Sequence, residues 1–173
     1  MGNKTYNQNL HDNRLMVHAM LKKKENAPGF TLLNASNAAI SLADFKGKKN
    51  VVLYFYPRDD TPGCTLEATE FTNLSGEFAR LQTVVIGVSK DSCKSHQAFI
   101  DKYNLKIELL ADTEGELCER YGVWQEKTKK GVTKMGIVRS TFIIDKKGVL
   151  SSVEYGTASG GHAPLVLEKI KKL

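Results

Sequence analysis

The chain has 173 residues and a net charge of +6, from 25 Lys and Arg against 19 Asp and Glu, and 41% of its residues are hydrophobic. This length and composition predict one globular domain with its own core and exclude the disordered and low-complexity classes. The apolar runs are strand-sized and too short to span a bilayer, so we expect no membrane segment. The basic residues are scattered and form no nucleic-acid-binding motif, so we expect no nucleic-acid partner.

Residues 1–25 differ from the rest of the chain, because they are rich first in asparagine and then in lysine. Leu10, Val17 and Leu21 share one helical face, which predicts an N-terminal extension that is partly helical. The segment has no secretory signal pattern, and the three cysteines are odd in number and widely spaced. We therefore expect a cytoplasmic protein with reduced cysteines, no metal site and no cofactor.

From residue 26 onward, strand-like and helix-like patterns alternate. A buried strand is predicted where apolar residues are continuous, and a helix where they recur at three- and four-residue steps. The alternation predicts an α/β domain over residues 26–173, with a mixed central sheet and helices on both faces. The predicted strands are 30–33, 39–42, 51–56, 83–88, 108–111, 141–145 and 149–155, and the predicted helices are 62–81, 91–103, 112–121 and 163–172.

Cys64 lies in the first turn of the helix predicted at 62–81, a few residues after the buried strand 51–56. Pro62 suits the first helical position, and Thr61 suits the cap before it. A sulfur at this position faces free backbone N–H groups and the positive end of the helix dipole, and both favour the thiolate. Cys64 is therefore the candidate nucleophile, although the spacing alone also fits an unreactive buried cysteine.

Segment 56–64, with the sequence Tyr-Pro-Arg-Asp-Asp-Thr-Pro-Gly-Cys, extends this local pattern to a longer motif. It resembles the active-site signature of the peroxiredoxins, and most closely that of the Q-type group, also called the bacterioferritin comigratory proteins. The resemblance covers residue 27 to the end and implies a thioredoxin-like fold and a thiol-dependent peroxidase. Further segments that resemble the family are 27–32, 42–48, 87–92, 110–112, 139–145 and 161–163.

The resemblance implies a role for each motif residue. Cys64 is the peroxidatic cysteine, which attacks a hydroperoxide and becomes a sulfenic acid. Arg139 keeps the sulfur anionic and stabilises the charge that develops as the O–O bond lengthens. Thr61 supplies a hydroxyl to the thiolate and the peroxide, and Pro57 shields the site from water. Glu67 orients the arginine.

The resemblance leaves open how the sulfenic acid is reduced. Family members carry a resolving cysteine at the position of Thr69 or at that of Ile100, and neither residue is a cysteine here. We expect an external thiol, from thioredoxin or another reductant, to resolve Cys64, with an internal disulfide to Cys93 as the alternative. We also expect hydrogen peroxide and organic hydroperoxides as substrates, and a monomer or weak dimer.

Two other functions are compatible with a reactive cysteine on this fold. A thioredoxin-like disulfide reductase is disfavoured, because no second cysteine lies three residues from Cys64. A redox sensor that keeps the fold would oxidise once and stop, so turnover with a thiol donor distinguishes it from a peroxidase. His96 and His162 have no catalytic partner in the sequence pattern and are interpreted as structural.

Overall fold

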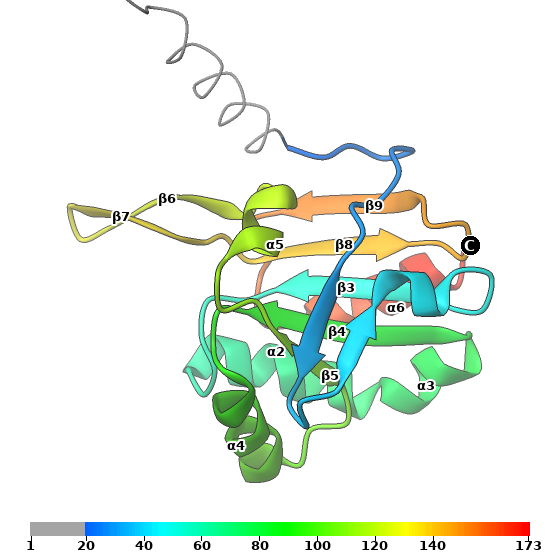
Figure 1. Cartoon of the computed structure of the whole chain (residues 1–173), viewed down its shortest axis with the longest axis horizontal. Helices are drawn as coiled ribbons and strands as arrows, with labels where there is room; N and C mark the ends of the chain where they lie inside the picture. The colour runs from blue at the N-terminus through cyan, green and yellow to red at the C-terminus, as the bar shows by residue number, and fades with distance from the viewer. Residues whose placement is uncertain (1–19) are drawn as a thin grey trace, which may run out of the picture.

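The computed structural model describes residues 20–173, so most of the predicted N-terminal helix lies outside the described residues. The domain is built on a seven-stranded mixed sheet in the order β2-β1-β5-β4-β3-β8-β9 (Figure 1). A separate antiparallel hairpin, β6 (Trp124–Lys129) and β7 (Val132–Ile137), projects beyond the sheet. The sheet strands are β1 (Thr31–Asn34), β2 (Ala39–Ser41), β3 (Asn50–Phe55), β4 (Thr83–Ser89), β5 (Glu108–Ala111), β8 (Ser140–Ile144) and β9 (Leu150–Tyr155).

Helices cover both faces of the sheet. In residues 20–173, no helix is both long enough and apolar enough to cross a membrane. The helices are the 3₁₀ turn η1 (Leu42–Phe45), α2 (Pro62–Asn73), α3 (Ser75–Arg80), α4 (Cys93–Tyr103), α5 (Glu116–Arg120) and α6 (His162–Ile170).

Strand β3 lies inside the sheet, parallel to β4 and antiparallel to β8, and is buried over its whole length. Val52 and Tyr54 belong to one core cluster, and Val51, Leu53 and Phe55 belong to the other. Successive side chains of a strand point to opposite faces, so the continuous apolar run records burial from both sides. Each of these side chains contributes roughly 1.5–3 kcal/mol on burial.

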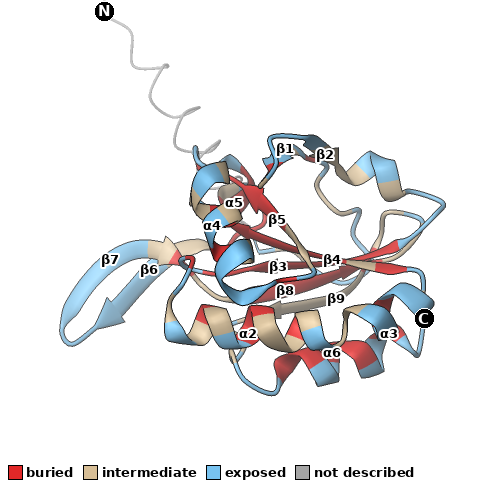
Figure 2. Ribbon diagram, turned by 90° about the horizontal axis from the view of Figure 1, so that it is seen from below, coloured by how far each residue is buried: buried red, intermediate tan, exposed pale blue. Residues whose placement is uncertain are grey.

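The helices divide between the two core clusters. Phe71 of α2, Phe78 of α3, Phe99 of α4 and Val166 of α6 pack in the cluster that contains Tyr54. Helix α5 packs in the cluster on the opposite face, and Figure 2 shows α2, α3 and α6 together below the sheet. The end of β3 and the start of α2 are therefore held by well-packed elements, which gives the intervening loop a fixed frame.

The predicted α/β class is confirmed, with two helices shorter than expected. The helix predicted at 62–81 is interrupted at Leu74, where the backbone (φ −99°, ψ 2°) separates α2 from α3. The helix predicted at 112–121 begins only at Glu116. Before it, the Asp112 carboxylate accepts the N–H groups of residues 117 and 118 at 3.1 and 2.8 Å, so Asp112 stays outside the helix.

The sequence patterns did not predict the β6–β7 hairpin. Its strands are mostly exposed and rich in lysine, so they lack the apolar alternation by which a half-buried strand is recognised. The one local signal is the turn, where Lys130 and Gly131 have φ values of +51° and +75°. Two consecutive positive φ values are typical of the tight turns that join antiparallel strands.

Residues 21–25, within the predicted N-terminal extension, bind the outer edge of the sheet. The N–H of Leu21 donates to the hydroxyl of Tyr155 at 2.9 Å. The N–H of Lys24 donates to the carbonyl of Leu150 at 2.8 Å, and the N–H of Leu150 donates to the carbonyl of Glu25 at 2.9 Å. This short stretch is thus attached to β9 by hydrogen bonds of the main chain.

Candidate active site

Cys64 is the third residue of α2, and its side chain is only 2% exposed. Thr61, with extended backbone (φ −103°, ψ 155°), is the N-cap residue, and Pro62 takes the first helical position. The first helical hydrogen bond runs from the N–H of Thr65 to the carbonyl of Thr61 at 2.8 Å. Among residues 20–173 no side chain makes a capping hydrogen bond to this turn, so its backbone N–H groups and the positive end of the helix dipole are available to a negative charge on the sulfur.

Arg139, between β7 and β8, bridges two side chains of α2. Its Nη2 donates to Cys64 Sγ at 3.3 Å, and its Nη1 donates to Glu67 Oε1 at 2.7 Å. Cys64 and Glu67 are three residues apart and therefore share one face of the helix. Burial acts to lower the pKa of Arg139, but the charges and hydrogen bonds of Glu67 and Cys64 outweigh it and raise that pKa.

Glu67 is fully buried beside this guanidinium. Burial raises the pKa of Glu67 to about 7, although the charge and hydrogen bond of Arg139 act to lower it. Its second carboxylate oxygen, Oε2, has no hydrogen-bond partner among residues 20–173. Ionisation of Glu67 therefore lowers the stability of the folded state, and the carboxyl titrates near neutral pH.

Gly63 leaves space for the guanidinium. A Cβ at this position would lie 3.3 Å from Arg139 Nη2 and 3.3 Å from Ser159 Oγ. The loop between β9 and α6, which carries Ser159, also binds the backbone of Arg139 through the N–H of Thr157 at 2.8 Å. Ser159 is not among the residues expected at the site, because nothing in its local sequence indicates that this loop lies beside Gly63.

Thr61 and Pro57 flank the site without a hydrogen bond to the sulfur. The hydroxyl of Thr61 donates to the carbonyl of Arg58 at 2.9 Å, and within residues 20–173 it makes no hydrogen bond to Cys64. The resemblance implies a hydrogen bond from Thr61 to the thiolate. This bond is absent among residues 20–173, because the hydroxyl donates to the carbonyl of Arg58 instead. Pro57 is exposed and follows directly after the buried Tyr56.

The other two cysteines lie in different surroundings, and all three are free thiols. Cys93 is the half-buried first residue of α4, directly after the N-cap Ser92, whose hydroxyl accepts the N–H of Ser95 at 3.1 Å. Cys118 is fully buried in α5 on the opposite face of the sheet from Cys64.

One cluster has the residue types of a metal site. The ligand atoms of Asp59, Asp91 and His96 lie within 4.8 Å of one another. Both ring nitrogens of His96 and both carboxylate oxygens of Asp59 are engaged in hydrogen bonds with protein groups. This arrangement fits a hydrogen-bonded network and not an open set of metal ligands.

A cysteine in the first turn of a helix, with an arginine donating to its sulfur, is a candidate site for thiol-dependent peroxidase chemistry. The family model described as the AhpC/TSA family matches residues 24–153. The chain belongs to this family, the peroxiredoxins. The fold and the activity that the sequence resemblance implied, that of a thiol-dependent peroxidase, are confirmed.

Relatives of the bacterioferritin comigratory group are similar over most of the chain. The putative peroxiredoxin bcp of Coxiella burnetii is 46% identical over 146 residues, which are 84% of this chain and 96% of that protein. Peroxiredoxin Bcp of Bacillus subtilis is 48% identical over 126 residues, 73% of this chain and 80% of that protein. The crystal structure of a cysteine-to-serine mutant of Xylella fastidiosa PrxQ superposes with a TM-score of 0.84 at 33% identity, covering 89% of this chain and 98% of that chain.

Proposed function

We propose that Cys64 is the peroxidatic cysteine, activated by Arg139 and by the start of α2. The observation that carries this proposal is the 3.3 Å contact from Arg139 Nη2 to Sγ in the first helical turn. A cation, a helix dipole and free N–H groups all stabilise a thiolate more than a thiol. Burial removes the water that would stabilise a negative charge on the sulfur, and these partners stabilise that charge instead.

In the first step, the Cys64 thiolate attacks the terminal oxygen of the hydroperoxide. The S–O bond forms while the O–O bond breaks, and the leaving alkoxide or hydroxide takes a proton to become an alcohol or water. The sulfur is oxidised to a sulfenic acid and the peroxide is reduced. Arg139 lies where negative charge moves from sulfur to the leaving oxygen, which makes it a prepositioned electrostatic stabiliser.

Glu67 and the residues before α2 hold the reacting groups in place. Glu67 fixes the guanidinium of Arg139 through the 2.7 Å ion pair. The hydroxyl of Thr61 donates its proton to the backbone carbonyl of Arg58, which leaves the lone pairs of its oxygen free. This oxygen therefore acts as an acceptor for the hydroperoxide O–H. Pro57, at the exposed start of the same loop, limits the entry of water.

We further propose that an external thiol resolves the sulfenic acid. That thiol attacks the Cys64 sulfur, an S–S bond forms, and the oxygen leaves as water; a second thiol of the reductant then releases Cys64 as a thiol. Cys118 is buried on the other face of the sheet, and Cys93 begins α4, where a disulfide would require the chain to move. A disulfide between Cys64 and Cys93 is the alternative.

Thioredoxin or a similar dithiol protein is the proposed reductant, acting on a monomer or weak dimer in the cytoplasm. The proposed substrates are hydrogen peroxide and organic hydroperoxides. A structure of the Xanthomonas campestris bacterioferritin comigratory protein, 34% identical with a TM-score of 0.78 over 83% of this chain and 90% of that chain, is described in terms of alkyl peroxide reduction. This relative supports the organic part of the substrate range.

Intact mass spectrometry after one equivalent of peroxide tests the whole scheme. The wild type and the Cys93→Ser variant are expected to gain the mass of one oxygen atom, which a dimedone label traps on Cys64. The Cys64→Ser variant is expected to gain nothing. Peptides mapped without reduction decide the resolution step, because a linked Cys64–Cys93 peptide would overturn the external-thiol scheme. Failure of thioredoxin to sustain turnover would shift the reductant to another thiol.

A further inference from the structure

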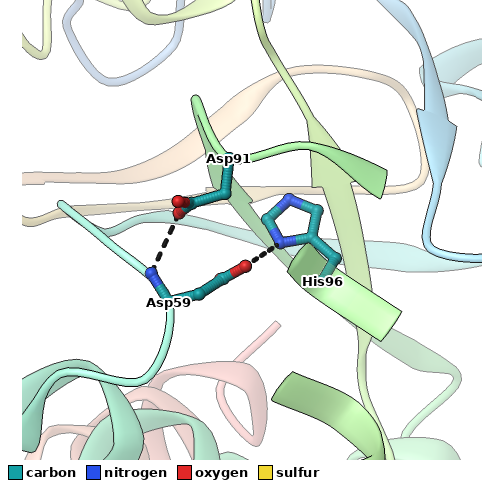
Figure 3. Close-up of side chains that lie close together, drawn as sticks. All are labelled: Asp59, Asp91 and His96. Atoms are coloured by element: carbon teal, nitrogen blue, oxygen red, sulfur yellow. Dashed lines mark hydrogen bonds and ion pairs between the residues drawn. The ribbon is translucent and has the colours of Figure 1, made fainter. Parts of the chain in front are cut away.

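Asp59 lies in the loop of residues 57–61 that joins β3 to α2, yet its side chain is buried. Its Oδ1 accepts a hydrogen bond from the hydroxyl of Tyr56 at 2.6 Å. Its Oδ2 lies 2.8 Å from Nδ1 of His96 (Figure 3). The same oxygen accepts a hydrogen bond from the hydroxyl of Ser95 at 2.8 Å. Ser95 and His96 belong to the first turns of α4, so this carboxylate ties the loop to that helix.

His96 has an acceptor at each ring nitrogen. Nε2 lies 2.9 Å from the carbonyl oxygen of Leu110 in β5, and Nδ1 lies 2.8 Å from the carboxylate of Asp59. A carbonyl and an ionised carboxylate only accept, so the ring donates from both nitrogens and is an imidazolium when Asp59 is ionised. The two residues then form a buried ion pair, and removing one partner leaves the other charge unpaired in the interior.

The main chain of the same loop is bound by residues at and just after the end of β4, the next strand along the chain. The N–H of Asp59 donates to Oδ2 of Asp91 at 2.9 Å (Figure 3). This oxygen also accepts a hydrogen bond from the hydroxyl of Ser89 at 2.6 Å. Two residues after Asp59 the chain reaches Thr61, the N-cap of α2. Side-chain and main-chain bonds to Asp59 therefore fix the point from which the Cys64 helix starts.

We propose that Asp59 and His96 are positioning residues of the peroxide site, acting through the 57–61 loop on the geometry of Cys64. This inference rests on the proposed role of Cys64. Their ion pair holds the N-cap residue Thr61 at a fixed place, and the first turn of α2 then presents Sγ to Arg139. A misplacement of about 1 Å can cost about a hundredfold in rate, so a loose loop slows peroxide reduction even in a folded protein.

The adjacent residue gives a matched control. Asp60 also binds α4, through Lys102 Nζ at 2.8 Å and the hydroxyl of Tyr103 at 2.5 Å, but this contact is exposed to solvent. Asp60 has a positive φ of +53°, a conformation that Asn tolerates. The Asp60→Asn variant therefore removes a charge from the same loop, and weakens a contact to the same helix, without changing the buried pair.

The experiment compares Asp59→Ala, Asp59→Asn, Asp60→Asn and the wild type by two rates. The first is the rate constant of Cys64 oxidation by hydrogen peroxide in a single turnover. The second is the rate of alkylation of each cysteine by iodoacetamide, followed by peptide mass spectrometry. Cys118, which is fully buried on the other face, reports opening of the whole fold.

In Asp59→Ala the peroxide rate is expected to fall about tenfold or more, while alkylation of Cys64 rises and Cys118 stays protected. Asp59→Asn is expected to recover most of the rate, because its amide donates to a neutral His96 while its oxygen accepts from Tyr56. Asp60→Asn is expected to match the wild type. A wild-type peroxide rate in Asp59→Ala, or alkylation of Cys118 rising in step with Cys64, would overturn the proposal.

Tyr56→Phe supplies a milder variant should Asp59→Ala not fold. It removes one donor to the Asp59 carboxylate and keeps the shape of the ring. As in Asp59→Ala, the peroxide rate is expected to fall and the alkylation of Cys64 to rise, but by a smaller factor. No change in either rate would contradict the inference. Cys64→Ser separates the two proposals: if that variant keeps its turnover, the function proposed for Cys64 fails, independently of Asp59.

Discussion

Cys64 and Cys118 occupy the same place in two different helices, and their surroundings differ in the sign of the nearest charge. Each is the third residue of its helix, and each is almost fully buried. Cys64 has the guanidinium of Arg139 at 3.3 Å from its sulfur. Cys118 lies beside Asp112, and burial, followed by this carboxylate, raises the pKa of its thiol far above the ordinary value.

Two cysteines that share a helix start and burial therefore differ in the charge that lies beside the sulfur or the thiol. Burial disfavours the thiolate at both positions, and a carboxylate adds to that penalty, whereas an arginine offsets it. In this chain the cation comes from the turn between β7 and β8, which brings Arg139 to the start of α2.

The largest expected effect separates the two cysteines directly. Cys64→Ser is expected to abolish peroxide turnover, because no oxygen nucleophile replaces the thiolate, while Cys118→Ser stays within about twofold of the wild type. Turnover with a thioredoxin system measures this, and circular dichroism checks that both variants are folded. Appreciable turnover in Cys64→Ser would disprove its assignment.

Removing the cation is expected to bring Cys64 closer to the behaviour of Cys118. Arg139→Ala should slow the peroxide step by about 10²–10³, the effect typical of one lost oxyanion donor. Arg120→Ala, an exposed arginine two residues after Cys118, is the matched control and should leave the rate unchanged. Single-turnover peroxide kinetics measure both variants, and wild-type kinetics in Arg139→Ala would remove it from the site.

The raised pKa of the buried Glu67 carboxyl predicts that the stability of the fold depends on pH. Its pKa rises on folding from 4.5 to about 7, so between these values the folded state binds more protons than the unfolded state. Stability is then lost as pH rises through this window, by about 3 kcal/mol at about 1.4 kcal/mol per pKa unit. Relative to Glu67→Gln, the wild type should lose this amount between pH 4.5 and pH 8.

Urea unfolding of both proteins across that range gives the measurement. Glu77→Gln, an exposed carboxylate on α3, controls for the loss of one acidic group. A constant difference between the wild type and Glu67→Gln would show that Glu67 does not carry the cost. At pH 8 the Gln variant should also reduce peroxide more slowly, because a neutral amide oxygen holds the Arg139 guanidinium less strongly than the carboxylate does.

The smallest effect is expected from deletion of residues 1–19. The family match begins at residue 24, and the sequence resemblance assigns no site residue to the segment 1–19. Deletion should leave the peroxide rate and the protection of Cys118 unchanged. A folded deletion variant with lower activity, measured by the same single-turnover kinetics, would contradict this.

The sequence predicted those parts of the molecule that local patterns determine. The apolar run at 51–56 and the stepwise apolar spacing after residue 62 correspond to β3 and α2. The motif before Cys64 and the segment at Arg139 carried the family resemblance, and the structure brings these two residues together as expected.

Contacts between distant segments could not be predicted in the same way. Ser159 reaches the site from a loop after β9, and His96 reaches the 57–61 loop from α4, although nothing in their neighbours along the chain points there. The sequence pattern offers His96 no catalytic partner and so predicts a structural role, whereas its partner in the structure, Asp59, lies 37 residues away along the chain. The β6–β7 hairpin was missed for a different reason, because exposed strands carry no hydrophobic signal.

The main-chain bonds of residues 24–26 to β9 bear on how the protein behaves at high concentration. β9 is the last strand of the sheet, and an uncovered edge is a template on which another chain can add as a strand. Lys24, Glu25 and Asn26 occupy part of that edge next to Val149 and Leu150. Shortening the chain past residue 26 would therefore favour aggregation during storage, whereas shortening it only to residue 20 leaves this protection in place.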